Sequence, residues 1–216
     1  MQRVLLLIPS TSYRARDYLD AARRLGIEIV VGSDHRQSLD AHAPGRSLAL
    51  EFTPTGEGVA RILEFARRFA LHAIIGTDDE TAVLAAAASR VLKLPHNDPE
   101  SVAIARDKHR FRQALARGGV GSPWFRRISL DDDLDAIARS IGYPCVLKPL
   151  SLSGSRGVIR ADDAAGFLAA STRIRRILGS VNGPAQAFAA DSILVEAFIP
   201  GREVALEGLR ARGRRR

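Results

Sequence analysis

The chain has 216 residues, of which 46% are apolar, 26% charged and 6% aromatic, with 18 glycines and 10 prolines. This composition excludes a disordered, collagen-like or disulfide-scaffold protein, and the length allows one large domain or two small ones. The formal net charge is +8, but residues 209–216 hold five of the 32 basic groups and no acid, so the rest carries only +3. That weak charge argues against a polyanionic partner, and we expect no nucleic-acid binding.

The single cysteine, Cys145, excludes an intrachain disulfide and favours a reducing compartment. No apolar run approaches the roughly 20 residues that span a bilayer. The apolar run after Arg3 is too short for a signal-peptide core and predicts a first strand. We therefore expect a cytoplasmic protein without a membrane partner. The sequence leaves open whether it forms a homo-oligomer.

The basic residues are unevenly divided between the two types. Of the 32, 29 are arginine, and the three lysines are Lys93, Lys108 and Lys148. A lysine kept in such a chain is a candidate for work that needs a compact ammonium rather than a planar guanidinium.

The first part of the chain alternates strand and helix patterns. The predicted strands are Arg3–Ile8, Glu28–Val31, Leu48–Phe52 and Ala73–Gly76, and the predicted helices are Arg14–Leu25, Glu57–Ala70 and Glu80–Leu92. This order predicts a parallel sheet covered by helices, with functional groups at the carboxyl ends of the strands. The candidates there are Ser10, Thr11, Ser12, Thr77, Asp78 and Glu80. Capping of the following helices is the alternative interpretation of these residues.

The second part predicts an α+β unit with a mostly antiparallel sheet. A helical stretch, Pro99–Arg117, leads into it. The predicted strands are Trp124–Leu130, Pro144–Pro149, Val158–Arg160, Ser192–Glu196 and Glu203–Leu209, and the predicted helices are Asp131–Ile141 and Asp162–Leu178.

Lys148 ends an apolar strand, and a loop of small polar residues follows it. Because a lysine at the end of a buried strand needs a counter-anion or a route to water, it marks a candidate anion site. The loop 151–157 contains three serines and two glycines, whose hydroxyl and backbone N–H groups can approach a polyphosphate closely. The alternatives are a lysine that reaches the surface and an ordinary hairpin turn.

A third pattern follows at ILVEAFIPGRE, residues 193–203. Glu196 ends an apolar strand, and backbone groups of Ala197, Phe198 and Ile199 could pair with an adenine edge. The Glu203 carboxylate could accept hydrogen bonds from two ribose hydroxyls. The alternative is a plain antiparallel hairpin with an outward polar face.

Taken in order, these segments resemble the ATP-grasp superfamily, of the carboxylate–amine ligase type and similar to biotin carboxylase and the large subunit of carbamoyl-phosphate synthase. The stretch ARDKHRFRQALARGGVGSPWF is similar to the family's "DK...R..L...G...P" segment. GYPCVLKPLSLSGSRGV resembles its lysine strand and glycine-rich flap, and ILVEAFIPGREVALEG its adenine hinge. The resemblance runs from about Thr77 to Gly208.

The resemblance implies a Rossmann-like α/β pre-ATP-grasp domain over 1–97, a helical connection over 98–123 and an incomplete α+β ATP-grasp domain over 124–209. It implies that ATP binds with its phosphates on Lys108 and Lys148. Ser153, Gly154, Ser155 and Gly157 would then close over the phosphates, residues 196–199 would hold adenine, and Glu203 the ribose. A small carboxylate substrate would contact the strand ends of the first domain.

The family's Mg²⁺ ligands lie on strands beyond the hinge, and residues 210–216 do not resemble that continuation. We therefore expect no metal ligands in this chain, an Arg-rich tail outside the fold, and a truncated relative of an ATP-dependent ligase. Two other interpretations stay open: a non-catalytic nucleotide-binding fragment, and a basic nucleic-acid-binding module.

Overall fold

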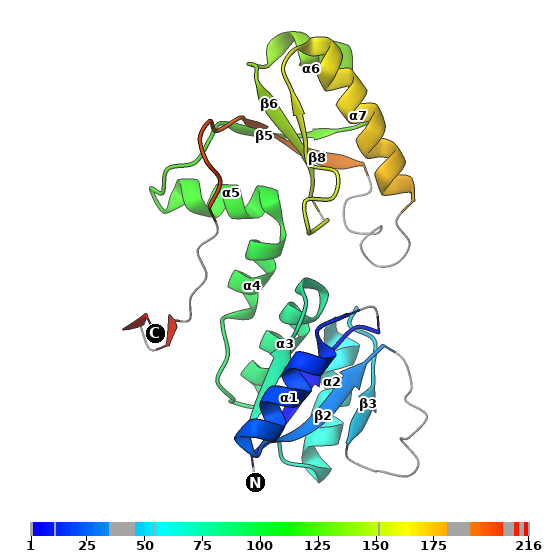
Figure 1. Ribbon diagram of the computed structural model, residues 1–216, viewed down its shortest axis with the longest axis vertical. Coiled ribbons are helices and arrows are strands. Elements are labelled where there is room, and N and C mark those ends of the chain that lie inside the picture. The colour runs from blue at the N-terminus through cyan, green and yellow to red at the C-terminus, as the bar shows by residue number, and fades with distance from the viewer. Residues whose placement is uncertain are drawn as a thin grey trace.

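The computed structural model describes residues 2–10, 12–34, 46–53, 55–150, 152–180 and 191–204, and the backbone of two short strands nearer the C-terminus. Two sheets lie toward opposite ends of the molecule, and two helices of the connecting segment lie between them (Figure 1). The first sheet is wholly parallel and the second wholly antiparallel.

The first sheet has the strand order β3-β2-β1-β4. Its strands are β1 (Arg3–Leu7), β2 (Glu28–Ser33), β3 (Ser47–Ala49) and β4 (Ala73–Gly76), and its helices are α1 (Ala15–Leu25), α2 (Thr55–Arg68) and α3 (Asp79–Val91). Successive residues of β1 point to opposite faces, and both faces are covered. Leu5 and Leu7 pack in one apolar cluster with residues of α2 and α3, and Val4 and Leu6 pack in another with residues of α1.

The connecting segment contains two helices where the sequence predicts one continuous stretch. α4 covers Pro99–Arg106 and α5 covers Lys108–Arg117. Asp107 between them has an extended backbone, and its carboxylate accepts hydrogen bonds from the backbone N–H groups of His109 and Arg110, at 2.9 and 3.1 Å. Aspartate is a strong N-cap, so it ends one helix and begins the next. The helical stretch predicted over Pro99–Arg117 is thus divided at Asp107, and the break places Lys108 in the first turn of α5.

The second sheet has the strand order β5-β8-β6-β7. Its strands are β5 (Phe125–Ser129), β6 (Cys145–Pro149), β7 (Ile159–Ala161) and β8 (Ser192–Ala197), and its helices are α6 (Leu134–Ser140) and α7 (Ala164–Gly179). Its core cluster includes Cys145, Leu147, Ile193 and Val195, which are fully buried, together with residues of α6 and α7. Both helices therefore cover the same face of this sheet.

The last predicted strand is only partly testable. Glu203 and Val204 lie outside any strand, which differs from the prediction of a strand beginning at Glu203, and residues 205–209 lie outside the described part. Two short strands follow, β9 (Arg210–Ala211) and β10 (Arg214–Arg215). They pair with each other and join neither sheet.

Candidate functional site

The charged residues lie on the face of the second sheet that α6 and α7 do not cover, which we call the open face, although Leu194 and Glu196 on it are buried. Successive residues of a strand point to opposite faces. Cys145 and Leu147 of β6 point into the core, so Val146 and Lys148 point to the open face. The register aligns Val146 with Glu196 and Lys148 with Leu194. Lys148 and Glu196 are thus diagonal neighbours on one face, although they are 48 positions apart in the sequence.

Glu196 is a buried carboxylate held by two cations. Its side chain is 5% exposed, and its Oε2 lies 2.5 Å from Lys148 Nζ. Arg112 of α5 donates from Nε to Oε1 at 2.6 Å and from its terminal nitrogen to Oε2 at 3.2 Å, which is a bidentate pair. Burial raises the pKa of Glu196, but the hydrogen bonds from Arg112 and Lys148 and the charges of both outweigh it, so the pKa lies below its ordinary value.

Lys108 joins this group from α5. Its Nζ donates to the backbone carbonyl of Leu150, just before the glycine-rich loop, at 3.2 Å, and to that of Leu152, inside the loop, at 2.5 Å. Burial, and next the charge of Lys148, lower the pKa of Lys108. Lys148 lies two residues before Leu150, whose carbonyl Lys108 contacts, so both lysines lie near the start of the loop. Two ammonium groups at the start of such a loop make it a candidate anion site.

The glycine-rich loop joins β6 to β7 as a hairpin, and Ser151 lies outside the described residues. Gly154 and Ser155 both have positive φ, 63° and 58°, and Arg156 N–H donates to the Ser153 carbonyl at 3.4 Å. Gly157 also has positive φ, and a Cβ there would lie 2.8 Å from the Pro149 ring. The positive φ values explain why glycine occupies positions 154 and 157. This backbone geometry is compatible both with an ordinary turn and with a flap over a phosphate.

In the predicted adenine hinge, residues 196–199, some backbone N–H groups are already hydrogen-bonded. The N–H groups of Ala197 and Phe198 donate to the carbonyls of Trp124 and Pro144, at 2.9 and 3.0 Å. The described residues provide no such acceptor for the Ile199 N–H. The Phe198 ring lies under the Arg160 guanidinium at 4.2 Å, while the Ile199 side chain is 64% exposed. Glu203 is exposed and has no ion-pair partner among the described residues.

The described predicted residues of the first domain follow the carboxyl ends of β1 and β4, next to Asp34 at the end of β2. The hydroxyl and the N–H of Ser10 donate to Asp34, and the Thr77 hydroxyl donates to Asp78 at 2.6 Å. Asp78 is the N-cap of α3, as the capping alternative expects. Burial first, and then the charges of Asp34 and Asp78, raise the pKa of Glu80. Thr11 lies outside the described residues, and Ser12 accepts a weak bond from the Arg14 N–H at 3.4 Å.

Sequence reasoning missed two members of these clusters. Arg112 is the arginine of the "DK...R" pattern, and its place in that pattern was the available signal, although the pattern does not name its partner. Asp34 directly follows β2, at the same sheet end as Ser10 and Thr77. Its position after a strand was a signal equal to theirs. Lys93, which has no predicted role, is an exposed residue with φ 55°.

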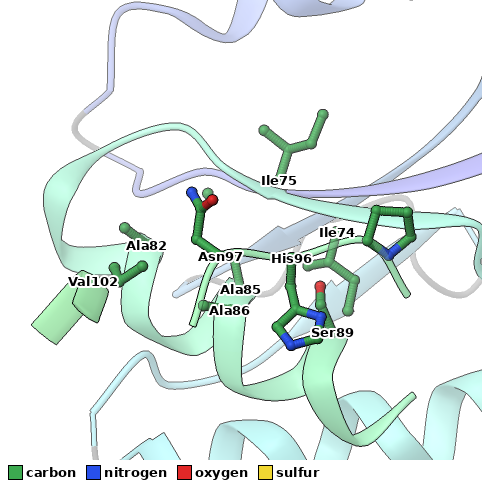
Figure 2. A pocket seen from close by; sticks show the side chains of 11 residues that line it. Ile74, Ile75, Ala82, Ala85, Ala86, Ser89, His96, Asn97 and Val102 are labelled. Carbon is green, nitrogen blue, oxygen red and sulfur yellow. The ribbon is translucent and has the colours of Figure 1, made fainter. Parts of the chain in front are cut away.

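A hollow of about 740 Å³ lies elsewhere, between β4, α3, residues 95–97 and α4 (Figure 2). Alanines of α3 and isoleucines of β4 form much of its wall, together with Ser89, His96 and Asn97. It contains none of the predicted nucleotide residues. No group of three or more His, Cys, Asp or Glu side chains among the described residues is arranged to hold a metal ion.

No helix among the described residues is both long enough and apolar enough to cross a membrane.

Comparison with known proteins identifies both halves of the chain. Residues 19–96 match the model of the ATP-grasp N-terminal domain, and residues 141–215 match that of the ATP-grasp domain. The second match includes most of the Arg-rich segment that the sequence places outside the fold.

Individual relatives agree with these family matches. An uncharacterized protein of Sinorhizobium fredii, y4rH, is 31% identical over 168 residues, 76% of this chain and 35% of that protein. The alanine–anticapsin ligase of Bacillus amyloliquefaciens is 33% identical over 97 residues, 45% of this chain and 21% of the ligase. The chain thus matches about a third or less of the length of these curated relatives.

Among solved structures, the L-amino acid ligase of Bacillus licheniformis has the same fold, with a TM-score of 0.68 at 18% identity. The similarity covers 93% of this chain and 45% of the ligase. The parallel sheet followed by the antiparallel sheet is the arrangement of the two matched domains. The chain belongs to the ATP-grasp superfamily.

Proposed function

We propose that this chain forms the nucleotide-binding part of an ATP-dependent ligase that joins a carboxylate to an amine. The observation that carries the proposal is the meeting of Lys108 and Lys148 where the glycine-rich loop begins. Two of the chain's three lysines come from separate elements and meet there. The ligase names of the relatives support the reaction class.

In this proposal ATP lies on the open face of the second sheet. The two ammonium groups contact the phosphates, and Ser153, Gly154, Ser155 and Gly157 close over them. Adenine lies against residues 196–199, where the free N–H of Ile199 can donate to a ring nitrogen. Glu203 accepts from the ribose hydroxyls.

The proposed reaction has two steps. A carboxylate oxygen of the substrate attacks the γ-phosphorus, and the bond to the β-phosphate oxygen breaks, which gives an acylphosphate and ADP. The amine then attacks the acyl carbon and releases phosphate. Lys108 and Lys148 stabilise the charge on the transferred phosphoryl group. The acid would contact Ser10, Thr11, Ser12, Thr77, Asp78 and Glu80.

Mg²⁺ supplies further charge neutralisation in phosphoryl transfer. The described residues hold no cluster of ligands that fits such an ion, so we assign it no step in this chain. A second candidate is a polypeptide that binds ATP without catalysis. The cytoplasmic location remains a prediction.

Trp124 provides the test of nucleotide binding. It is half exposed, and its carbonyl accepts the hydrogen bond from Ala197 in the proposed adenine hinge. We expect ATP to change its fluorescence, and Lys148→Ala to abolish the change. Lys93→Ala, at an exposed lysine away from the site, is the matched control and should bind like the parent chain.

Catalysis is tested separately, by ADP release with mixtures of amino acids. ADP release that requires an amino acid supports the ligase, whereas ATP binding without ADP supports the non-catalytic candidate. No response of the parent chain to ATP would contradict both.

A further inference from the structure

Arg112 of α5 pairs with Glu196, the carboxylate that also binds Lys148. It makes a bidentate pair with Glu196, and its side chain is 19% exposed. Lys148, on the other side of Glu196, is 25% exposed. Glu196 is thus enclosed by two cations, and only one of them belongs to the proposed phosphate contacts.

The charge balance of these three side chains depends on Arg112. Arg112, Glu196 and Lys148 together carry one net positive charge. Without Arg112, Lys148 and Glu196 would form a neutral pair 2.5 Å apart, and the attraction of Lys148 for a phosphate would largely be cancelled. Partial burial makes such a cancellation strong, because less water screens the charges.

The neighbouring charged groups do not replace Arg112. Glu196 also acts on Lys108, whose pKa is lowered by burial and by Lys148, and raised by Asp79, Asp107 and Glu196. Three carboxylates therefore already act on the second ammonium. Arg110, two positions before Arg112 on α5, pairs instead with Glu100 of α4.

We propose that Arg112 is a positioning residue for phosphate binding: it offsets the charge of Glu196, so that Lys148 keeps a net positive charge for the nucleotide. This inference rests on the proposed function. It assigns to the arginine of the "DK...R" segment an electrostatic task that is distinct from contact with ATP.

The experiment compares the affinities for ATP and adenosine, both measured by Trp124 fluorescence at fixed salt. Adenosine has no phosphates, so the ratio of the two affinities isolates the phosphate contribution and cancels effects on the adenine hinge. We expect Arg112→Gln to lower the ratio about tenfold, a coupling of ordinary size for charges a few ångströms apart. Arg110→Gln removes the same charge from the same helix, and should change the ratio less than about twofold.

Two further variants separate charge from folding. Arg112→Gln leaves Glu196 with one partner fewer and can destabilise the chain, whereas the double variant Arg112→Gln/Glu196→Gln removes both charges and keeps the net charge of the three residues at +1. We expect the double variant to recover the parent ratio to within about threefold. Glu196→Gln alone should keep the ratio or raise it.

The outcomes are distinguishable. If Arg112→Gln lowers both affinities equally, or if the double variant remains as weak as Arg112→Gln, the assignment of Arg112 is wrong while the proposed function stands. The same holds if Glu196→Gln lowers the ratio as strongly as Lys148→Ala. If the parent chain binds neither ligand, the proposed function is wrong and the assignment with it.

Discussion

The two sheets carry their polar residues in different places. The parallel sheet is covered on both faces, so its polar groups lie at the carboxyl ends of the strands, where Ser10, Asp34 and Thr77 meet. The antiparallel sheet has α6 and α7 on one face, and its charged residues lie on the other. The difference indicates that helix coverage decides where a sheet can expose polar side chains: at the strand ends of a sheet covered on both faces, and on a face of a sheet covered on one.

The strongest test of this comparison is alanine substitution at adjacent strand positions. Leu5 and Leu6 of β1 are both buried, on opposite faces, so replacing either by alanine should lower the free energy of unfolding by about 2–5 kcal/mol. In β6, Leu147→Ala should cost about as much, but Val146→Ala, on the open face, only about 1 kcal/mol. Chemical denaturation measures all four variants. If Val146→Ala and Leu147→Ala lowered the free energy of unfolding equally, Val146 would not lie on a less buried face than Leu147.

A smaller effect is expected on the pH dependence of stability, through Glu196. Burial raises the pKa of Glu196, but the hydrogen bonds and charges of Arg112 and Lys148 outweigh it and hold the pKa below its ordinary value. A carboxyl group with a lowered pKa stabilises the folded state above its unfolded pKa, and this stability is lost as the pH falls through the folded pKa. The parent chain should therefore be more stable than Glu196→Gln near neutral pH, by about 1–2 kcal/mol.

The difference in the free energy of unfolding between the parent chain and Glu196→Gln should shrink below about pH 4.5. Urea denaturation at several pH values measures it. The matched control is Glu100→Gln, which removes the partner of Arg110 at a side chain that is 66% exposed. Exposed ion pairs contribute little, so its effect should stay under about 0.5 kcal/mol. A constant gap between parent and Glu196→Gln from pH 7 to pH 3 would count against the buried pairing.

The smallest effect is expected in the loop between β6 and β7. Gly154→Ala forces a Cβ into a positive-φ position, which costs about 1 kcal/mol although no atom lies within 4 Å of the new carbon. Gly142→Ala, also without neighbours within 4 Å but with no positive φ, should be nearly neutral. Thermal unfolding compares them. Equal melting temperatures would mean that the loop does not keep this backbone geometry.

Much of the architecture could be predicted because it depends on local patterns. Strand and helix positions around both sheets agree with the apolar periodicity, mostly to within two or three residues at each end. Two of the differences have local physical causes. Asp107 divides a long helical pattern, and Asp133 delays the start of α6 by accepting a hydrogen bond from the Ala136 N–H at 2.9 Å.

By itself, the sequence determined the order of the two domains, the strand that carries Lys148 and the glycine-rich loop, and it singled out Lys108 and Lys148 as candidates among 32 basic residues. Only the tertiary structure decided the partners of these residues. Arg112 meets Glu196 across 84 positions, and Lys108 meets the Leu152 carbonyl across 44. Periodicity and capping act over a few residues, whereas a buried carboxylate takes whichever cations the packing of separate elements brings to it.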